Sequence, residues 1–341
     1  MPAIAVDAMG GQQAPEALVR GVAEVSLHTD IQCVLVGDAT RIQRLLEGVA
    51  YNPEHIDIVH AGEVIERDED PRVAVQRKRD ASLLVAMRQV QRGRCAAVVS
   101  AGNPAAALAA AQREFALLPG VHNAAIARVY PRQVEQPEQD PLALALDCGA
   151  TVRCSAEELV QFAVMGSTYA RVISKVAAPR VALLNMGRTA EQGDDVLTAT
   201  HRRLEALVGV NFVGNIEGHQ LSGGRADVVV CEGLVGNIVI KLLESVANMA
   251  VDLTSTAAAQ RNWRWRAGMA IMATGTDRLR ALADYASYGG APILGFDQVC
   301  IKAHGRADAQ SIANAVKVAA KAARDGLIPA LRTALAPAGR P

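Results

Sequence analysis

Residues 96–117 read AAVVSAGNPAAALAAAQREFAL, and this stretch decides the fold class. Ala96–Ser100 is short and apolar throughout, which is typical of a strand buried on both faces. The small-residue turn Ala101–Asn103 follows, and Pro104 suits the first position of a helix, where no backbone N–H is needed. The alanine-rich run Ala105–Leu117 then predicts that helix. A buried strand that turns directly into a helix is the repeating unit of a parallel α/β sheet.

The same alternation of short apolar runs and longer helical stretches continues along the chain. Further strands are expected at Ile4–Asp7, Cys33–Gly37, Ile56–His60, Ala124–Val129, Leu142–Asp147, Val181–Asn185, Val210–Gly214, Asp227–Cys231 and Val299–Ala303. Helices are expected at Ala14–Leu27, Arg72–Arg92, Ser155–Lys175 and Leu234–Asp252. The pattern predicts an α/β sandwich with a mostly parallel sheet. Because no linker divides the chain, we expect a single domain over residues 1–334, with a helical excursion over 253–288 and a flexible tail over 335–341.

Composition excludes several classes of protein. The chain has 341 residues, of which half are hydrophobic, so a sizeable core can be buried and disorder is excluded. Lys+Arg and Asp+Glu both number 35, and aromatic residues make up only 3%. A nucleic-acid-binding surface would show a basic excess and aromatic stacking platforms, so no nucleic-acid partner is expected.

Cysteine usage and the N-terminal sequence indicate a cytoplasmic protein. The six cysteines contain no CxxC pair and are interpreted as buried free thiols, with zinc or disulfide bonds as the alternative. His60 and His304 show no metal-ligand spacing, so no metal site is expected. The N-terminus lacks the pattern of a signal peptide, and no apolar run approaches the roughly 20 residues of a membrane span.

Small and polar residues follow many of the predicted strands, and ligands bind outside the carboxyl ends of strands in open α/β sheets. Ser100, Gly102 and Asn103 form the strongest such turn, because the free N–H groups of the following helix attract anions. The structural alternative is that Asn103 merely caps that helix. More generally, these residues either line a long crevice or form ordinary strand-to-helix turns.

Two further turns in the second half are ambiguous in the same way. Asp147 either binds a substrate group or accepts hydrogen bonds from turn amides, and Cys148 lacks the His and Asn partners of a nucleophile. Asn237 and Lys241, one helical turn apart, either face a ligand or form a cap and a solvated side chain. The chain has no GxxxxGK[ST] loop and no GxGxxG after its first strand. The residues alone therefore indicate an α/β enzyme that handles a phosphorylated or anionic ligand.

A set of short motifs, in order along the chain, is more specific. These motifs are IAVDAMGG (4–11), VGD (36–38), SAGN (100–103), QFA (161–163), LLN (183–185), GNIEG (214–218), DVVVC (227–231), VGN (235–237) and YGGA (288–291). Together they closely resemble the bacterial phosphate acyltransferase family, PlsX, over nearly the whole chain. The resemblance implies a three-layer α/β/α sandwich related to phosphotransacetylases and isocitrate-type dehydrogenases. It also implies a homodimer that needs no metal or dissociable cofactor.

The activity implied by this resemblance is transfer of a fatty acyl group from acyl carrier protein to inorganic phosphate. The acyl phosphate would feed glycerol-3-phosphate acylation in phospholipid synthesis. In this interpretation the turn Ser100, Gly102 and Asn103 binds phosphate, and Asn237 and Lys241 donate to the phosphate or the oxyanion. Asp7, Asn185 and Glu217 organise the crevice, and the remaining substrate-binding candidates are Gly10, Gly11 and Glu232.

Several site loops depart from the family pattern. Pro104-Ala105 stands where the family has Thr-Gly, and His219-Gln220 where it has Arg-Asp. Gln192 occupies the position of an expected lysine, so Arg188 in the same turn is the candidate for the missing cation. These substitutions keep two alternatives open: an acyltransferase of the phosphotransacetylase type that uses acyl-CoA, and a non-catalytic homologue that binds acyl carrier protein.

The excursion over residues 253–288 contains the two tryptophans of the chain, Trp263 and Trp265, beside several arginines. Amphipathic rings next to cations suit a lipid headgroup interface. This pattern predicts peripheral contact with the inner face of the membrane, where a glycerol-3-phosphate acyltransferase would receive the product. The alternative is a helical hairpin packed in the dimer interface, where Trp and Arg are also enriched.

Overall fold

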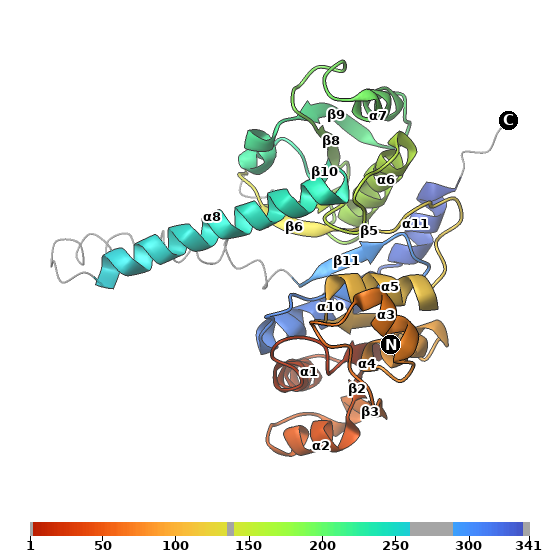
Figure 1. The fold of residues 1–341 in the computed structure, drawn as a ribbon, viewed down its shortest axis with the longest axis vertical. Helices are drawn as coiled ribbons and strands as arrows, with labels where there is room; N and C mark the ends of the chain where they lie inside the picture. The colour runs from red at the N-terminus through yellow and green to blue at the C-terminus, as the bar shows by residue number, and fades with distance from the viewer. Residues whose placement is uncertain (1–2, 135–139, 260–288, 337–341) are drawn as a thin grey trace.

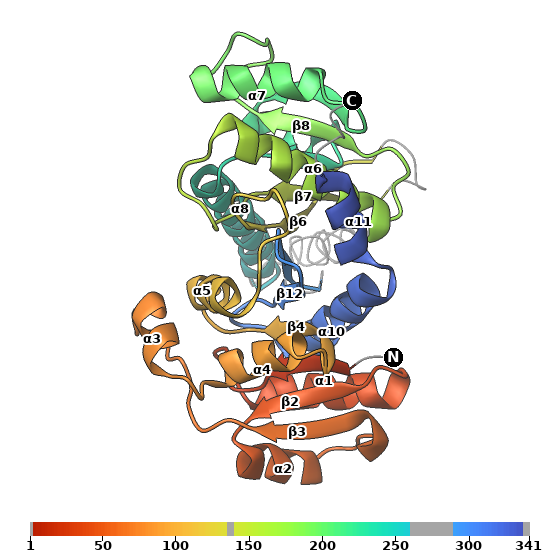
Figure 2. The same ribbon diagram turned by 90° about the vertical axis from the view of Figure 1, so that its right-hand side faces the viewer.

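In the computed structural model, which describes residues 3–134, 140–259 and 289–336, the strands form two mostly parallel sheets. The first sheet has the order β3 (Ile56–His60), β2 (Cys33–Gly37), β1 (Ala3–Asp7), β4 (Cys95–Ser100), β12 (Val299–Lys302), β11 (Ala291–Leu294) and β5 (Ala125–Ile126). The second has the order β6 (Arg128–Pro131), β7 (Leu142–Leu146), β10 (Val228–Val230), β8 (Arg180–Leu184) and β9 (Asn211–Ile216). The α/β class with mostly parallel strands is thus confirmed, and Figure 2 shows the two sheets one above the other.

Helices cover both faces of the first sheet because its strands are apolar on both sides. Val6 and its neighbours pack against α1 (Glu16–His28) and α10 (Ala309–Arg324), whereas Ala5 and its neighbours pack against α4 (Ser82–Gln91) and α5 (Pro104–Glu114). In the second sheet, α6 (Ala156–Val172) covers one face and α8 (Gly233–Ala259) the other. The other helices of the described residues are α2 (Ala39–Glu47), α3 (Pro71–Arg77), α7 (Asp195–Glu205) and α11 (Leu327–Leu335), with 3-10 turns at Pro53–His55 and Gly218–Gly223.

The two sheets are joined by one extended segment. The sequence predicts a single strand over Ala124–Val129, but the segment changes sheets at Ala127. Its first half, β5, pairs antiparallel with β11, and its second half, β6, pairs antiparallel with β7. Side chains from both halves of the molecule share one continuous core. The carboxyl ends of the parallel strands of both sheets are thereby placed around this crossing.

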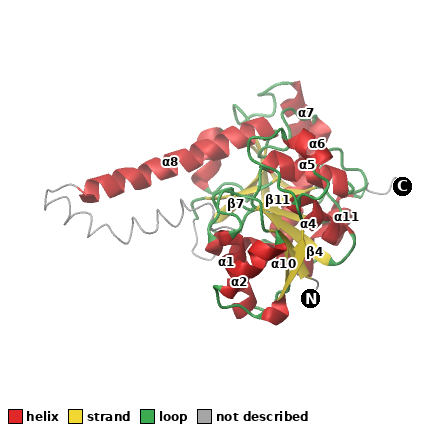
Figure 3. Cartoon of the chain, turned by 60° about the horizontal axis from the view of Figure 1, so that its bottom comes forward, coloured by secondary structure: helices red, strands yellow, loops and turns green. Residues whose placement is uncertain are grey.

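Helix α8 is longer than the predicted Leu234–Asp252 and projects away from the second sheet (Figures 1 and 3). One stripe of its surface is apolar and exposed, at a spacing of three or four residues: Leu234, Ile238, Leu242, Val246 and Met249. The predicted excursion beyond residue 259, with Trp263 and Trp265, lies outside the described residues, as does the tail from residue 337. Within the described part of the chain, no helix is long and apolar enough to cross a membrane.

Candidate active site

Asp7 is the centre of the carboxyl edge of the first sheet. It is the last residue of β1 and is 1% exposed. Its Oδ1 accepts a hydrogen bond of 2.6 Å from Ser82 at the start of α4, and its Oδ2 accepts one of 2.7 Å from Ser100 at the end of β4. Burial raises the pKa of Asp7, and the two serine hydroxyls oppose that rise. The carboxyl group therefore fixes β1, β4 and α4 relative to one another.

Glycines let two turns pack over this carboxyl group. A Cβ on Gly10 would lie 2.3 Å from Asp7 Oδ2 and 3.0 Å from the nitrogen of Gly102. Gly11 has φ +120°, and a Cβ there would lie 3.0 Å from the Cβ of Ala101. The structure shows that Gly10 and Gly11 allow close packing of the turn after β1 against the turn after β4. Their predicted contact with a ligand stays a prediction.

Asn103 is the N-cap of α5, as the structural alternative proposed. Its side-chain oxygen accepts a hydrogen bond of 2.8 Å from the backbone N–H of Ala105, and Pro104 occupies the first turn. The backbone N–H of Gly102 donates to Ser100 Oγ at 3.1 Å. The turn is thus internally bonded, and it places the N-terminus of α5 beside Asp7.

In the second sheet, Asp147 accepts hydrogen bonds from turn amides. Its Oδ1 accepts from the backbone N–H of Ile126 at 2.9 Å, and its Oδ2 accepts from both the N–H and the hydroxyl of Thr151 at 2.8 Å. It is fully buried, so no carboxylate oxygen is presented to solvent. Of the two readings left open by the sequence, the structure supports the turn. The thiol of Cys148 is also buried, and burial raises its pKa well above the ordinary value, so the thiolate nucleophile is disfavoured.

The start of α8 lies over this turn. A Cβ on Gly149 would lie 3.8 Å from the side chain of Asn237, which places the amide of Asn237 beside the turn after β7. Glu244, two helical turns further along α8, points at the crossing segment, where its Oε1 lies 3.8 Å from Arg128 Nη1. Lys241 is exposed, and Glu232 pairs with the exposed Arg153 at 3.6 Å. Of these predicted residues, Asn237 is the best placed to face a ligand at the crossing.

Asn185 and Glu217 follow β8 and β9, at the outer side of the second sheet. Asn185 binds the following loop, because its amide donates to the carbonyl of Gln192 at 2.8 Å and its oxygen accepts from Met186 N at 2.7 Å. Gln192 in turn accepts from the backbone of that loop at 2.9 Å, and Arg188 is exposed. Among the described residues, no hydrogen bond or ion pair joins this loop to Asp7 or Asn237.

Lys302 is a buried charged residue at the carboxyl edge of the first sheet that no sequence motif marks. It is the last residue of β12 and the register partner of Ser100, and it is only 5% exposed. Its ammonium donates to the carbonyl of Ala303. Burial lowers the pKa of Lys302 to about 7. A lysine at the end of an apolar strand usually reaches solvent, so only the tertiary structure shows that this one is buried beside Asp7 and Ser100.

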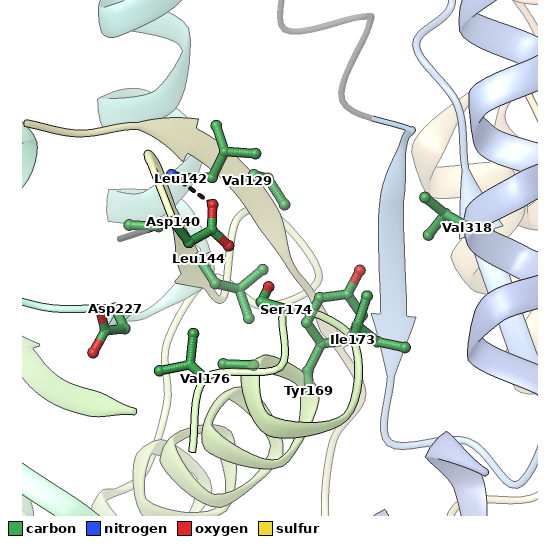
Figure 4. Close-up of a pocket in the computed structure, with 12 residues that line it drawn as sticks. Val129, Asp140, Leu142, Leu144, Tyr169, Ile173, Ser174, Val176, Asp227 and Val318 are labelled. Carbon is green, nitrogen blue, oxygen red and sulfur yellow. Dashed lines mark hydrogen bonds between the residues drawn. The ribbon is translucent and has the colours of Figure 1, made fainter. Parts of the chain in front are cut away.

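A cavity of about 120 Å³ lies at the opposite edge of the second sheet (Figure 4). Its walls include the first residues of β7, the end of α6 and Asp227, which precedes β10. Ligand chemistry is expected at the carboxyl ends of the strands, so this cavity is not assigned to the reaction. The described residues contain no group of three or more His, Cys, Asp or Glu side chains that could hold a metal ion.

Comparison with known proteins places the chain in a family. The sequence profile described as "Fatty acid synthesis protein" matches residues 3–329. A phosphate acyltransferase of Dictyoglomus turgidum is 39% identical over 318 residues, which cover 93% of each chain. A phosphate acyltransferase of Thermosynechococcus vestitus is 39% identical over 319 residues, covering 94% of this chain and 91% of the relative.

The fold is also found in solved structures. A phosphotransacetylase from Streptococcus pyogenes superposes with a TM-score of 0.65 at 15% identity, covering 95% of this chain and 94% of the other. At that identity the likeness concerns the fold alone. The profile match and the two relatives show that the chain belongs to the phosphate acyltransferase family, PlsX.

Proposed function

We propose that this protein transfers a fatty acyl group from acyl carrier protein to inorganic phosphate, for use in phospholipid synthesis. The observation that carries the proposal is the match to curated phosphate acyltransferases over 93% of both chains. The site geometry is compatible with it, because the carboxyl ends of two sheets and the starts of α5 and α8 surround one crossing segment.

The reaction needs no covalent enzyme intermediate. An oxygen of hydrogen phosphate attacks the thioester carbonyl carbon, a C–O bond forms, and the C–S bond breaks. The proton of hydrogen phosphate ends on the departing thiol of the carrier. The protein has to hold two anionic partners together and to stabilise the developing oxyanion.

Four of the predicted residues have a direct place in this scheme. We assign the start of α5 to phosphate, because a helix N-terminus attracts anions, and Gly102 belongs to the turn that leads into it. Asn237 is the oxyanion donor, since its amide lies at the crossing beside Gly149. Lys241 and Arg188 are exposed cations that would meet the charged carrier or the phosphate as it enters.

The test compares two acyl donors with the purified protein. Acyl phosphate is trapped as its hydroxamate, with acyl-acyl carrier protein or acyl-CoA as donor and with inorganic phosphate varied. We expect phosphate-dependent product, formed faster from acyl-acyl carrier protein. Product from acyl-CoA alone would instead favour the phosphotransacetylase type of activity, and no product from either donor would leave a non-catalytic binding protein.

We also infer a homodimer and a cytoplasmic location with peripheral membrane contact. The exposed apolar stripe of α8 supports the dimer, since monomers rarely leave such a face uncovered. The membrane contact rests on the sequence around Trp263 and Trp265. Light scattering measures the mass in solution. Salt-sensitive flotation with anionic vesicles, lost when both tryptophans become alanine, tests the membrane contact, and retention by the double variant would refute it.

A further inference from the structure

The carboxyl edge of the first sheet carries a row of polar side chains on one face. Asp7 is the register partner of Ser100, and Ser100 is the register partner of Lys302. Register partners on neighbouring strands point to the same face of a sheet. Asp7, Ser100 and Lys302 therefore lie side by side across β1, β4 and β12, beneath the starts of α4 and α5.

The row continues toward the crossing segment. Lys302 is the register partner of Ala291 in β11. The pairing of β11 with β5 joins Ile293 to Ile126, and the backbone N–H of Ala127 donates to the carbonyl of Pro292 at 2.9 Å. Arg128, the first residue of β6, follows directly beside the start of β11. Two long cationic side chains, Lys302 and Arg128, therefore belong to the segments on either side of the start of β11. Figure 2 shows α5 and α8 on the same side of the sheets.

The charges of this part of the sheet are incompletely balanced. Lys302 is 5% exposed, and its one hydrogen bond to a described residue goes to the carbonyl of Ala303. Arg128 forms a long ion pair with Glu244, in which Arg128 Nη1 lies 3.8 Å from Glu244 Oε1. That oxygen is buried and accepts no hydrogen bond from a described residue. Asp7 is occupied by Ser82 and Ser100. Asp7 is the anion that acts on Lys302, but among the described residues Lys302 forms no ion pair, and a buried ammonium without one is unfavourable unless a ligand supplies the negative charge.

His304 adds a donor to the same place. Its Nδ1 accepts the backbone N–H of Arg306 at 3.2 Å, so in the neutral ring Nε2 carries the proton. His304 follows Lys302, the last residue of β12, by two residues and so belongs to the same carboxyl edge. Burial lowers the pKa of His304, the Arg128 charge lowers it further, and Glu244 opposes that fall. An ammonium, a guanidinium and an imidazole N–H together suit a phosphate group, which offers several acceptor oxygens.

We propose that a phosphate group binds over Ala291, between Lys302 and Arg128, and that Lys302 holds this phosphate for attack on the thioester. The proposal rests on the function proposed above and adds a binding residue to it. Two sources of phosphate have this chemistry: free inorganic phosphate and the phosphodiester of the prosthetic arm that carries the acyl group. We assign the site to inorganic phosphate because the N-terminus of α5, where the helix dipole favours an anion, lies beside it.

The test replaces Lys302 by Met, which keeps the length of the side chain and removes its charge. The matched control is Lys321→Met, because Lys321 also donates to a backbone carbonyl, that of Ile173 at 2.7 Å, but lies in α10. Loss of a charge-assisted hydrogen bond should raise the KM for phosphate about 10- to 100-fold in Lys302→Met. The KM for acyl-acyl carrier protein should not change in either variant. If only the KM for acyl-acyl carrier protein rises, the site binds the phosphodiester of the prosthetic arm, and the proposal is overturned.

Direct binding separates this inference from the proposed function. Inorganic phosphate alone should raise the melting temperature of the wild type and of Lys321→Met, but not that of Lys302→Met or Arg128→Gln. In phosphate-free buffer Lys302→Met should melt no lower than the wild type, because it buries a methionine instead of an ammonium. If the wild type makes acyl phosphate and Lys302→Met keeps its phosphate KM and its phosphate stabilisation, the inference is wrong while the function stands. If phosphate stabilises the wild type but not Lys302→Met, and no acyl phosphate forms, the proposed function is wrong while the phosphate-binding site at Lys302 is supported.

Discussion

Gly10→Ala should disrupt the buried carboxyl group around which the site is built. The new Cβ would lie 2.3 Å from Asp7 Oδ2, whereas ordinary contacts begin at 3.4 Å. The carboxyl group must therefore retreat by about 1 Å, which takes it out of hydrogen-bond reach of Ser100, now at 2.7 Å. A lost hydrogen bond to a buried charged group costs about 1.5–3 kcal/mol, and overpacking adds about 1–3 kcal/mol. We expect the free energy of unfolding to fall by about 2.5–6 kcal/mol.

Urea denaturation measures this change, with Gly223→Ala as the matched control. A Cβ on Gly223 meets no atom within 4 Å, so its effect should stay below about 1 kcal/mol. In the enzyme assay, Gly10→Ala should also raise the KM for phosphate, because the displaced carboxyl group moves the turn that contains Gly102. Equal stability and equal phosphate KM in the two variants would refute the packing role of Gly10.

Three further predictions concern different parts of the molecule. Asn237→Ala should lower kcat about 100-fold with little change in the KM for phosphate, as expected for an oxyanion donor, and an unchanged kcat would remove Asn237 from the reaction. Asp227→Asn breaks the buried ion pairs of Asp227 with Arg132, at 2.7 Å, and with Arg180, at 3.1 Å. Urea denaturation should show that the free energy of unfolding falls by about 3–5 kcal/mol. The KM values for the substrates should not change, because Asp227 lies at the amino end of β10, away from the site. The pKa of Lys302 is about 7 in the folded chain and 10.5 ordinarily, so between these values the unfolded chain binds more protons. The free energy of unfolding of the wild type should therefore rise with pH from about 7 toward 10.5 relative to Lys302→Met, and parallel curves would contradict the buried lysine.

Local patterns located most strands and the edge where the site lies. The nine runs predicted beside Ala96–Ser100 all contain observed strand residues, because an apolar run between turn residues has few other ways to be buried. β11 was missed, since Pro292 and the glycines around it read as a turn. The predicted helix Arg72–Arg92 is two helices, and the break at Lys78–Ala81 lets Ser82 begin α4 and reach Asp7.

The arrangement of the site depended on contacts that local sequence does not encode. The crossing at Ala127 divides one apolar run between two sheets, and the division follows from pairing with β11 and β7 rather than from its composition. The burial of Lys302 likewise follows from its place in the middle of the first sheet. The glycines after β1 stand out in the sequence, but the reason that the structure gives for Gly10, the nearby carboxyl group of Asp7, is a tertiary contact that the sequence does not reveal.

The origin of the oxygens in the product tests the central claim most directly. The purified protein is mixed with acyl-acyl carrier protein and inorganic phosphate labelled with heavy oxygen, and the acyl phosphate is analysed by mass spectrometry. If phosphate itself attacks the thioester carbonyl, the product retains every labelled oxygen of the phosphate, and free thiol appears in equal amount. Release of unlabelled fatty acid at a rate independent of phosphate, or an acyl phosphate that has lost one labelled oxygen, would contradict direct attack by phosphate at this site.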